Sequence, residues 1–346
     1  MDELGNIGLY KQITPFTNLN AGSAEWCRAE KGGRDYFIKK FQSPVYPSEE
    51  LGLPEKKFKT RMARYHASET SRKSIYRALR ENNRSGALVV PYEVISYQYH
   101  LCAVSDFVTG NLLPEQICRL SEWQRIVLMR TLTLALTDVH RAGIVHSDMK
   151  PENVVITQNP ETGSCILKLI DFDGSFPVSE PPKNITCDPT YLAPEAYAKE
   201  NDPSVAIGER IDDFATGIIF HYFWTCRLPE KEQGYTIGQC VLEDRPVVID
   251  PYMPAKLKTV ISGLLEKDPG KRMSISTAYY ELGKLLEDHP VEIVNLQPAP
   301  VVEWRDDIQL DDVFDTGRPA GKKAGCLAAV LGIAALCIAI LVPIFL

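Results

Sequence analysis

Hydrophobic and polar residues follow two different spacings along this chain. In the first hundred residues, short apolar runs such as "YFIKKF", "LVVPYEVISY" and "HLCAVSDFV" are separated by turn residues, which predicts β-strands. One long helix is predicted among them, from about residue 62 to 81, because helix-forming residues predominate there. Ile75, Tyr76 and Leu79 recur at spacings that share one face of this helix. The first part of the chain is therefore predicted to be a small sheet with one helix.

From about Glu115 onward the spacing becomes that of helices. Ser121 is predicted to cap the helix of "EWQRIVLMRTLTLALTDVH", which carries an apolar stripe. A polar loop follows this helix, and "CILKL" after the loop predicts a short strand that ends in carboxylates. The two spacings together predict the α+β class, with a sheet first and helices after it.

The composition is that of an ordinary globular protein. The 346 residues carry a formal net charge of -7 with a pI near 5.5, and 45% of them are hydrophobic. This length suits one two-lobed unit or two modest domains, and the mild acidity argues against nucleic acid as a partner. The nine cysteines form no C-x-x-C pair, which predicts reduced thiols in a cytosolic compartment. No secretory signal peptide is expected, because Asp2 and Glu3 follow Met1.

The C-terminal residues 324–346 contain no charged side chain. A helix of this length reaches roughly 34 Å, more than the ~30 Å hydrocarbon core of a membrane. We therefore predict a single transmembrane helix at 324–346 after a Pro-rich, acidic linker at 290–323; the alternative is a buried core helix. Arg318, Lys322 and Lys323 precede the apolar run, which by the positive-inside rule predicts a tail-anchored protein with its folded part in the cytoplasm.

One central loop concentrates chemically active side chains. The stretch "HSDMKPENVVI" holds His146, Asp148, Lys150 and Asn153 between a helix-like run and a strand-like run. "LIDFDG" and then "YLAPE" follow it along the chain. These three motifs, in this order, resemble the catalytic loop, the metal-binding turn and the end of the activation segment of the protein kinase family.

The resemblance implies a fold and a set of cofactors. It covers roughly residues 10 to 288 and implies two lobes: a small antiparallel N-lobe with one helix at 1–108, and a larger helical C-lobe at 109–289. The implied cofactors are ATP and Mg²⁺, and the implied partner is a protein that accepts the γ-phosphate on a hydroxyl. With the predicted anchor, the chain is similar to serine/threonine kinases of bacterial type, which would place it in the cell membrane.

The implied roles follow from the needs of phosphoryl transfer, which are a positioned hydroxyl and neutralised phosphate charge. By resemblance, Asp148 accepts the proton of the substrate hydroxyl, Lys150 steadies the γ-phosphate, and Asn153 and Asp171 hold Mg²⁺. Lys150 stands two residues after Asp148, as it does in serine/threonine-directed members of the family. The alternative interpretation is a polar turn with a capping aspartate.

Further residues are implied for nucleotide binding. "YFIKKF" is similar to the strand that carries the phosphate-pairing lysine of the family, which assigns that role to Lys39. The resemblance implies a glutamate partner on the following helix, for which Glu69 is preferred and Glu81 is the alternative. Asp106 and Val108 belong to the implied hinge that binds adenine.

Other positions match the family's structural residues. Glu195 and Arg272 match a buried ion pair, and Asp213 of "IDDFATG" matches a carboxylate that braces the backbone of the catalytic loop. Two positions depart from the family, since Ser147 replaces an arginine and Asp173 stands where the metal-binding turn has glycine.

The phosphate-covering loop departs from the family as well. Where G-x-G-x-x-G is expected, "NAGSAE" keeps Gly22 and has other residues at the remaining two glycine positions. Side chains there obstruct the close approach of backbone amides to phosphates. The loss of these two glycines is therefore expected to weaken the binding of ATP.

Three functions are compatible with these residues. The first is an active membrane-anchored serine/threonine kinase, the second a pseudokinase scaffold, and the third a related phosphotransferase for small molecules. Retention of Lys39, Asp148, Asn153 and Asp171 together favours catalysis, since a scaffold needs none of the four. The "APE" motif argues against the third function.

A basic stretch lies in the predicted helix and its flanks. Residues 56–84 contain ten lysines and arginines against Glu69 and Glu81. Such a run is typical of a solvated helix surface. The other interpretation is a contact with anionic lipid or with an acidic partner, which tethering to a membrane would favour.

Overall fold

The computed structural model describes residues 5–18, 24–48, 52–185 and 187–288. The predicted linker at 290–323 and the predicted transmembrane segment lie outside the described residues. Within the described ranges, none of the helices combines the length and the apolar composition that crossing a bilayer requires.

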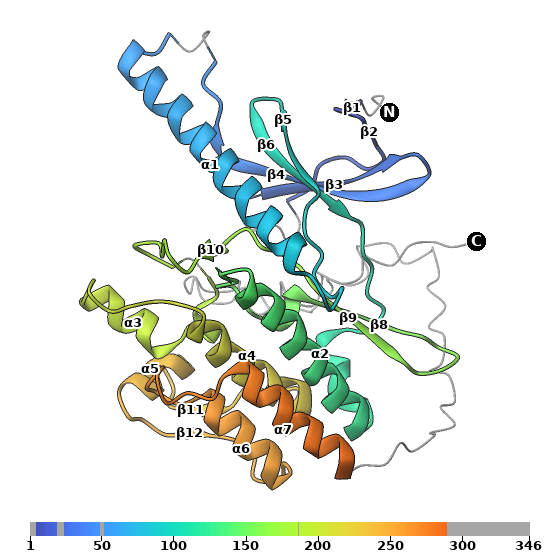
Figure 1. The fold of residues 1–346 in the computed structure, drawn as a ribbon, viewed down its shortest axis with the longest axis vertical. Helices are drawn as coiled ribbons and strands as arrows, with labels where there is room; N and C mark the ends of the chain where they lie inside the picture. The colour runs from blue at the N-terminus through green and yellow to red at the C-terminus, as the bar shows by residue number, and fades with distance from the viewer. Residues whose placement is uncertain (1–4, 19–23, 49–51, 186, 289–346) are drawn as a thin grey trace, which may run out of the picture.

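The N-terminal part is a six-stranded sheet in the order β1-β2-β3-β4-β6-β5, in which every neighbouring pair is antiparallel. Figure 1 shows this sheet beside the long helix α1 (Glu55–Asn82), above the helical part of the molecule. The strands are β1 (Asn6–Ile7), β2 (Tyr10–Gln12), β3 (Ala24–Lys31), β4 (Arg34–Val45), β5 (Glu93–Tyr97) and β6 (His100–Asp106).

Helix α1 begins seven residues before the start that the apolar spacing predicts, since residue 62 was the expected beginning. Its first two turns expose most of their side chains and so carry no apolar stripe to mark them. Ile75, Tyr76 and Leu79 are buried, which confirms the predicted apolar face. These residues join the main hydrophobic core, which continues from the sheet into the helical lobe. The core therefore connects the two lobes.

The C-terminal part is mainly helical. Its helices are α2 (Glu122–Arg141), α3 (Pro194–Asn201), α4 (Arg210–Thr225), α5 (Ile237–Leu242), α6 (Ala255–Leu264) and α7 (Ile275–Asp288), with 3-10 turns η2 (Pro114–Arg119), η3 (Pro151–Asn153) and η4 (Pro189–Tyr191). Its strands form three short pairs: β7 (Ile144–Val145) with β10 (Phe176–Pro177), β8 (Val154–Gln158) with β9 (Cys165–Leu169), and β11 (Glu230–Lys231) with β12 (Val247–Val248).

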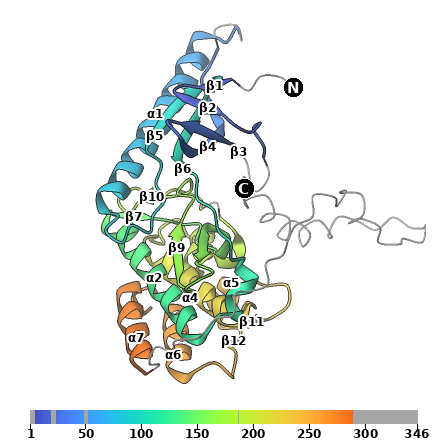
Figure 2. The same ribbon diagram turned by 90° about the vertical axis from the view of Figure 1, so that its right-hand side faces the viewer.

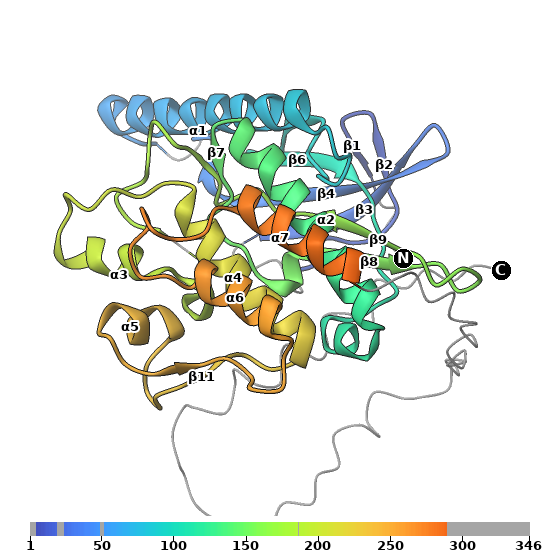
Figure 3. The ribbon, with the colours of Figure 1, turned by 60° about the horizontal axis from the view of Figure 1, so that its bottom comes forward.

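Helix α4 lies at the centre of the helical lobe and is buried over almost its whole length. Figures 2 and 3 show α2 and α6 beside it, with α7 lying against α2 and α6. Ser121 caps α2 as predicted, because its hydroxyl accepts from the Gln124 amide while the Gln124 side chain accepts from the Ser121 amide. The sheet lobe followed by a helical lobe confirms the predicted α+β class.

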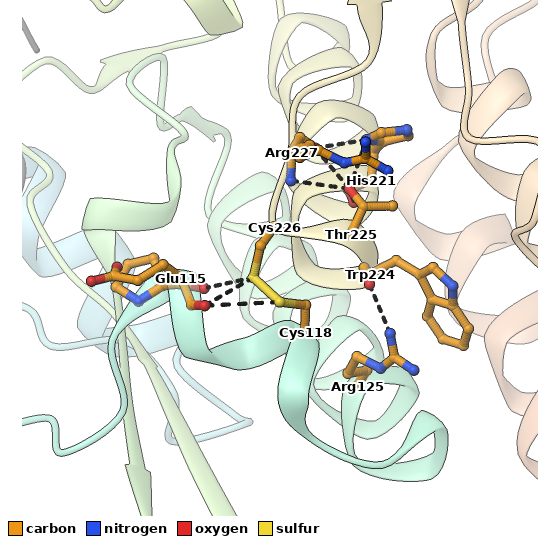
Figure 4. The surroundings of a disulfide bond; sticks show 9 residues. Glu115, Cys118, Arg125, His221, Trp224, Thr225, Cys226 and Arg227 are labelled. Carbon is orange, nitrogen blue, oxygen red and sulfur yellow. Dashed lines mark hydrogen bonds between the residues drawn. A yellow bond between two sulfur atoms is a disulfide. The ribbon is translucent and has the colours of Figure 1, made fainter.

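The prediction of reduced thiols is wrong for one pair of cysteines. Cys118 in η2 and Cys226, the residue that follows α4, form a disulfide across 108 residues of sequence (Figure 4). Cys27, Cys102 and Cys240 are free and buried, as the prediction requires. The bonded pair carries no local signal in the sequence, because only the packing of η2 against α4 brings the two thiols together.

Candidate active site

The β8–β9 hairpin brings two predicted metal ligands to the same end of a strand pair. Val154, the first residue of β8, pairs with Leu169, the last residue of β9. Asn153 therefore precedes one strand where Asp171 follows the other, and the Ile170 amide donates to the Asn153 carbonyl at 3.0 Å. This register places an amide and a carboxylate side by side at the mouth of the hairpin.

The catalytic-loop side chains form one hydrogen-bonded unit. Lys150 Nζ donates to Asp148 Oδ2 at 2.8 Å, and the Asn153 side-chain nitrogen donates to the Asp148 carbonyl at 2.7 Å and to its Oδ2 at 3.2 Å. Burial lowers the pKa of Lys150, but Asp148 more than compensates, so the lysine pKa is raised and the amine stays protonated. Asp148 is thus oriented by both neighbours in the loop.

The carboxylate that braces the loop backbone is Asp212, and the assignment of this role to Asp213 is wrong. Asp212 Oδ2 accepts from the His146 amide and Oδ1 from the Ser147 amide, each at 2.8 Å. His140 Nε2 lies 3.0 Å from Asp212 Oδ2. Asp213 instead pairs with Arg210 at 2.6 Å. Successive residues of a helix point about 100° apart, so one position decides which carboxylate faces the loop.

Two non-glycine residues of the site have a left-handed backbone. Ser147 has φ 67° and Asp171 has φ 64°, a conformation that costs of order 1–3 kcal/mol and persists where the surroundings hold it. Asp212 holds Ser147 from one side, and the Ser147 hydroxyl donates to the Gly174 carbonyl at 2.8 Å. Ser147 therefore links the catalytic loop to the metal-binding turn, although it lacks the charge of the expected arginine.

The predicted structural ion pair is confirmed. Arg272 donates through both terminal nitrogens to Glu195, at 2.6 and 2.9 Å. It also donates to the backbone carbonyls of Arg210, Glu266 and Lys267. The arginine side chain is 0% exposed and that of Glu195 is 6% exposed. This pair secures the end of the activation segment to the helical lobe.

Lys39 reaches the site from strand β4. Its Nζ donates to both oxygens of Asp171 at 3.0 Å and lies 2.5 Å from Asp173 Oδ2. Burial lowers the pKa of Lys39, but Asp173 and Asp171 raise it above its ordinary value. Burial and the neighbouring Asp171 raise the pKa of Asp173, whereas Lys39 outweighs burial and lowers that of Asp171. The lysine is therefore positioned beside the metal-binding turn with its charge retained.

The implied ion pair between Lys39 and Glu69 is not formed. Glu69 instead contacts two residues of its own helix, Lys73 at 2.6 Å and His66 at 3.4 Å. Glu81, the alternative, is exposed near the end of α1. The Glu69 side chain is only 27% exposed, but both of its carboxylate oxygens are engaged by residues of its own helix.

The implied hinge lies where β6 ends. Asp106 is the last residue of that strand, with its carboxylate 3.7 Å from Arg34, and the Phe107 amide donates to the Asp35 carbonyl. Val108 follows in the connection to the helical lobe and is partly buried. Gly22 lies outside the described residues.

The residues present fit Mg²⁺ together with a nucleotide. The amide nitrogen of Asn153 donates to Asp148, which directs its amide oxygen away from that residue. An amide oxygen and the Asp171 carboxylate are ligand types that Mg²⁺ prefers. No cluster of three or more His, Cys, Asp or Glu ligands occurs among the described residues. One carboxylate and one amide oxygen suit a Mg²⁺ ion whose remaining ligands are phosphates and water.

Comparison with known proteins agrees with this geometry. The family described as the protein kinase domain matches residues 56–281. The chain is 31% identical over 193 residues to serine/threonine-protein kinase GL21140 of Drosophila persimilis, which covers 52% of this chain and 25% of that protein. It is 30% identical over 196 residues to serine/threonine-protein kinase DCLK3 of Mus musculus, which covers 54% of this chain and 24% of that protein. The chain thus spans about a quarter of the length of the curated relatives it matches.

Proposed function

The chain belongs to the protein kinase family, and on this premise we propose that it is an active kinase that transfers the γ-phosphate of ATP to serine or threonine hydroxyls of proteins. The observation that carries this proposal is the hydrogen-bonded unit of Asp148, Lys150 and Asn153. The two charged residues Asp171 and Lys39 stand next to each other at the metal-binding turn.

In the proposed reaction each side chain has one task. Asp148 accepts the proton of the substrate hydroxyl while that hydroxyl attacks the γ-phosphorus, and ADP leaves. Lys150, held by Asp148, neutralises charge on the transferred phosphoryl group. Asn153 and Asp171 would hold Mg²⁺, which supplies charge neutralisation at the phosphates, and Lys39 would bind the nucleotide phosphates.

The alternative is a pseudokinase scaffold with weak or absent phosphotransfer. The loss of glycines around Gly22 favours this alternative, because it affects the loop that covers phosphates. The internal hydrogen bonds of the catalytic loop favour catalysis, because a scaffold gains nothing from orienting Asp148 with both Lys150 and Asn153.

Asp148→Asn tests the proposed activity. Incubation with Mg-ATP and a generic protein substrate, followed by mass spectrometry, should reveal phosphoserine or phosphothreonine for the wild type. The variant should lose roughly 10²–10⁴-fold in turnover, because asparagine cannot accept the proton. Asp244→Asn is the matched control, since Asp244 is an exposed aspartate paired with Lys267 and far from the loop in sequence. Equal transfer by wild type and Asp148→Asn, including none by either, would contradict the proposed catalytic role of Asp148, and absence of transfer from both would favour the scaffold.

The membrane attachment is a second part of the proposal. The charge-free run at 324–346 is proposed to anchor the chain in a membrane, with the kinase domain in the cytoplasm. The resemblance to kinases of bacterial type stays a prediction. Truncation after Ala320 should release the protein from membranes, whereas carbonate washing should leave the full chain in the pellet. Protease added to vesicles with their cytoplasmic face outward should digest the folded domain; its complete protection would contradict this orientation.

The basic face of α1 and its flanks is proposed to contact anionic lipid next to this anchor. Of the ten lysines and arginines in residues 56–84, all but Arg72 are exposed. Lys59 and Lys73 are engaged by Glu55 and Glu69. Cosedimentation with phosphatidylserine vesicles should exceed that with phosphatidylcholine vesicles and fall with added salt. Equal binding to both vesicles would assign these residues to an ordinary solvated surface.

A further inference from the structure

The carboxylates that hold Lys39 both come from the metal-binding turn. Asp171 accepts from Lys39 through two bonds of 3.0 Å, and Asp173 Oδ2 lies 2.5 Å from the same nitrogen. Asp173 stands where the family resemblance implies glycine, and the glutamate implied on α1 does not reach the lysine. The family's usual pair is therefore absent from the described site, while an additional carboxylate is present.

Helix α1 reaches this additional carboxylate with a cation and a hydroxyl. Arg72 Nη1 lies 3.7 Å from Asp173 Oδ1, and the Tyr76 hydroxyl donates to the same oxygen at 3.4 Å. The two residues are four positions apart and so share a helical face. Tyr76 is 2% exposed and the Arg72 side chain 18% exposed, so water does not compete freely for these contacts.

Arg72 is also held from the sheet. Its guanidinium carbon lies 3.6 Å from the centre of the Phe41 ring, a stacked cation–π contact. Phe41 and Lys39 are two residues apart on β4, so their side chains leave the same face of the strand. The contacts close a ring that runs from β4 through Lys39, Asp173 and Arg72 to Phe41 and back to β4.

We propose that Asp173 is the positioning carboxylate for Lys39 in this protein, and that Arg72 of α1 holds Asp173 in place. The inference rests on the proposed kinase function and specifies how its phosphate-binding lysine is aligned. The link between α1 and the lysine is made through the metal-binding turn, which supplies the carboxylate that the family resemblance implies on the helix.

The cation Arg72 and the additional carboxylate Asp173 depend on each other through charge. Lys39 and Arg72 balance Asp171 and Asp173, so the described cluster is neutral overall. A glutamate at position 72 would set three carboxylates around one lysine, and a glycine at position 173 would leave two cations without the bridging anion. Asp171 faces the predicted metal site, so Asp173 is the carboxylate that remains available to Lys39 when Mg²⁺ is bound.

Hydrogen exchange on the full-length protein without nucleotide tests the link itself. Asp173→Asn keeps the shape of the side chain and removes its charge, while Arg72→Ala removes the cation. Amides in residues 72–79 should exchange about 5- to 10-fold faster in both variants, because the contacts that hold α1 to the turn are weakened. Arg77→Ala is the matched control, an exposed arginine of the same helix, and should exchange as the wild type does.

Kinetics test the positioning role. Asp173→Asn and Arg72→Ala should each lower kcat/KM for ATP about 10- to 100-fold, since a misplaced phosphate-binding group is costly. The double variant Arg72→Ala/Asp173→Asn should lose little more than Asp173→Asn alone, because the two residues act in series. Arg72→Glu/Asp173→Gly, which supplies the carboxylate from the helix, should recover activity relative to Asp173→Gly.

The outcomes separate this inference from the proposed function. Wild-type exchange and kinetics in both Asp173→Asn and Arg72→Ala would overturn it. A raised Mg²⁺ requirement in Asp173→Asn with an unaffected Arg72→Ala would overturn it as well, by making Asp173 a metal ligand. A wild-type protein that transfers no phosphate, but whose α1 exchanges faster in both variants, would reject the kinase activity and retain the Asp173–Arg72 link.

Discussion

Two ion-pair networks of this protein differ in how completely they are enclosed. The Glu195–Arg272 pair lies within the helical lobe, and its side chains are 6% and 0% exposed. The Lys39 cluster lies between the sheet and the metal-binding turn, where the side chains of Asp171 and Asp173 are 31% and 26% exposed. One network is closed to solvent, and the other is open to a ligand.

The difference follows from what each network has to do. Each nitrogen of the Arg272 guanidinium donates to Glu195 or to a backbone carbonyl. The pair can therefore hold the chain, but it has no free donor for a new partner. Lys39 is held by carboxylates alone, which a metal ion and phosphates can replace. Closed pairs therefore maintain the fold here, and the open cluster is suited to chemistry.

The largest expected effect on stability comes from breaking the closed pair. Arg272→Ala leaves the Glu195 carboxylate buried without its partner, and such a loss costs about 3–5 kcal/mol of unfolding free energy. Urea unfolding followed by circular dichroism measures this change. The exposed pair of Arg245 with Glu232 provides the control, since Arg245→Ala should change little. A loss below about 1 kcal/mol for Arg272→Ala would show that enclosure does not distinguish the two networks.

The buried carboxyl group of Asp213 is expected to make the stability of the helical lobe depend on pH. Burial raises the pKa of Asp213 to about 6, although His140 and Arg210 lower it. Because the folded state then binds the proton more tightly than the unfolded state, stability should be greatest below about pH 4 and fall by about 3 kcal/mol as the pH rises to 6. Asp213→Asn should remove this part of the pH dependence in urea unfolding between pH 4 and 6. An unchanged slope would show that Arg210 keeps the carboxylate ionised.

Asp212→Asn distinguishes the two neighbouring carboxylates of α4. Loss of the charge that accepts from the His146 and Ser147 amides should cost about 1–3 kcal/mol and lower kcat, since the catalytic loop is no longer held. Asp213→Asn is the matched comparison and should leave kcat near the wild-type value at neutral pH. Equal kcat losses in the two variants would contradict the assignment of the brace to Asp212.

The smallest change in stability is expected in the open cluster. Lys39→Met should abolish most phosphate transfer while it changes the unfolding free energy by about 1 kcal/mol or less, because the partly exposed carboxylates regain water. Urea unfolding and a transfer assay on the same preparation compare the two effects. A stability loss as large as that of Arg272→Ala would place Lys39 among the structural pairs.

Local pattern was sufficient for much of the fold and the site. Ser121 as a cap and the buried face of Ile75, Tyr76 and Leu79 depend on neighbours within one or two helical turns, so they were predictable without tertiary contacts. The catalytic loop was identified by its resemblance to the family, and its contacts are local, because Lys150 and Asn153 contact Asp148 across two and five residues of sequence. Residues that are close in sequence have relative positions that the local backbone sets.

Contacts across long stretches of sequence were decided by the tertiary structure. The partner of Lys39 depends on which part of α1 lies beside the metal-binding turn. Arg72 of that helix reaches Asp173, whereas Glu69 pairs with Lys73. The choice of Asp212 over Asp213 depends on the rotation of α4 in the core, and the Cys118–Cys226 disulfide depends on the packing of η2 against that helix. A sequence specifies which residues neighbour one another along an element, whereas packing of the whole core sets the rotation of each element and thereby its distant partners.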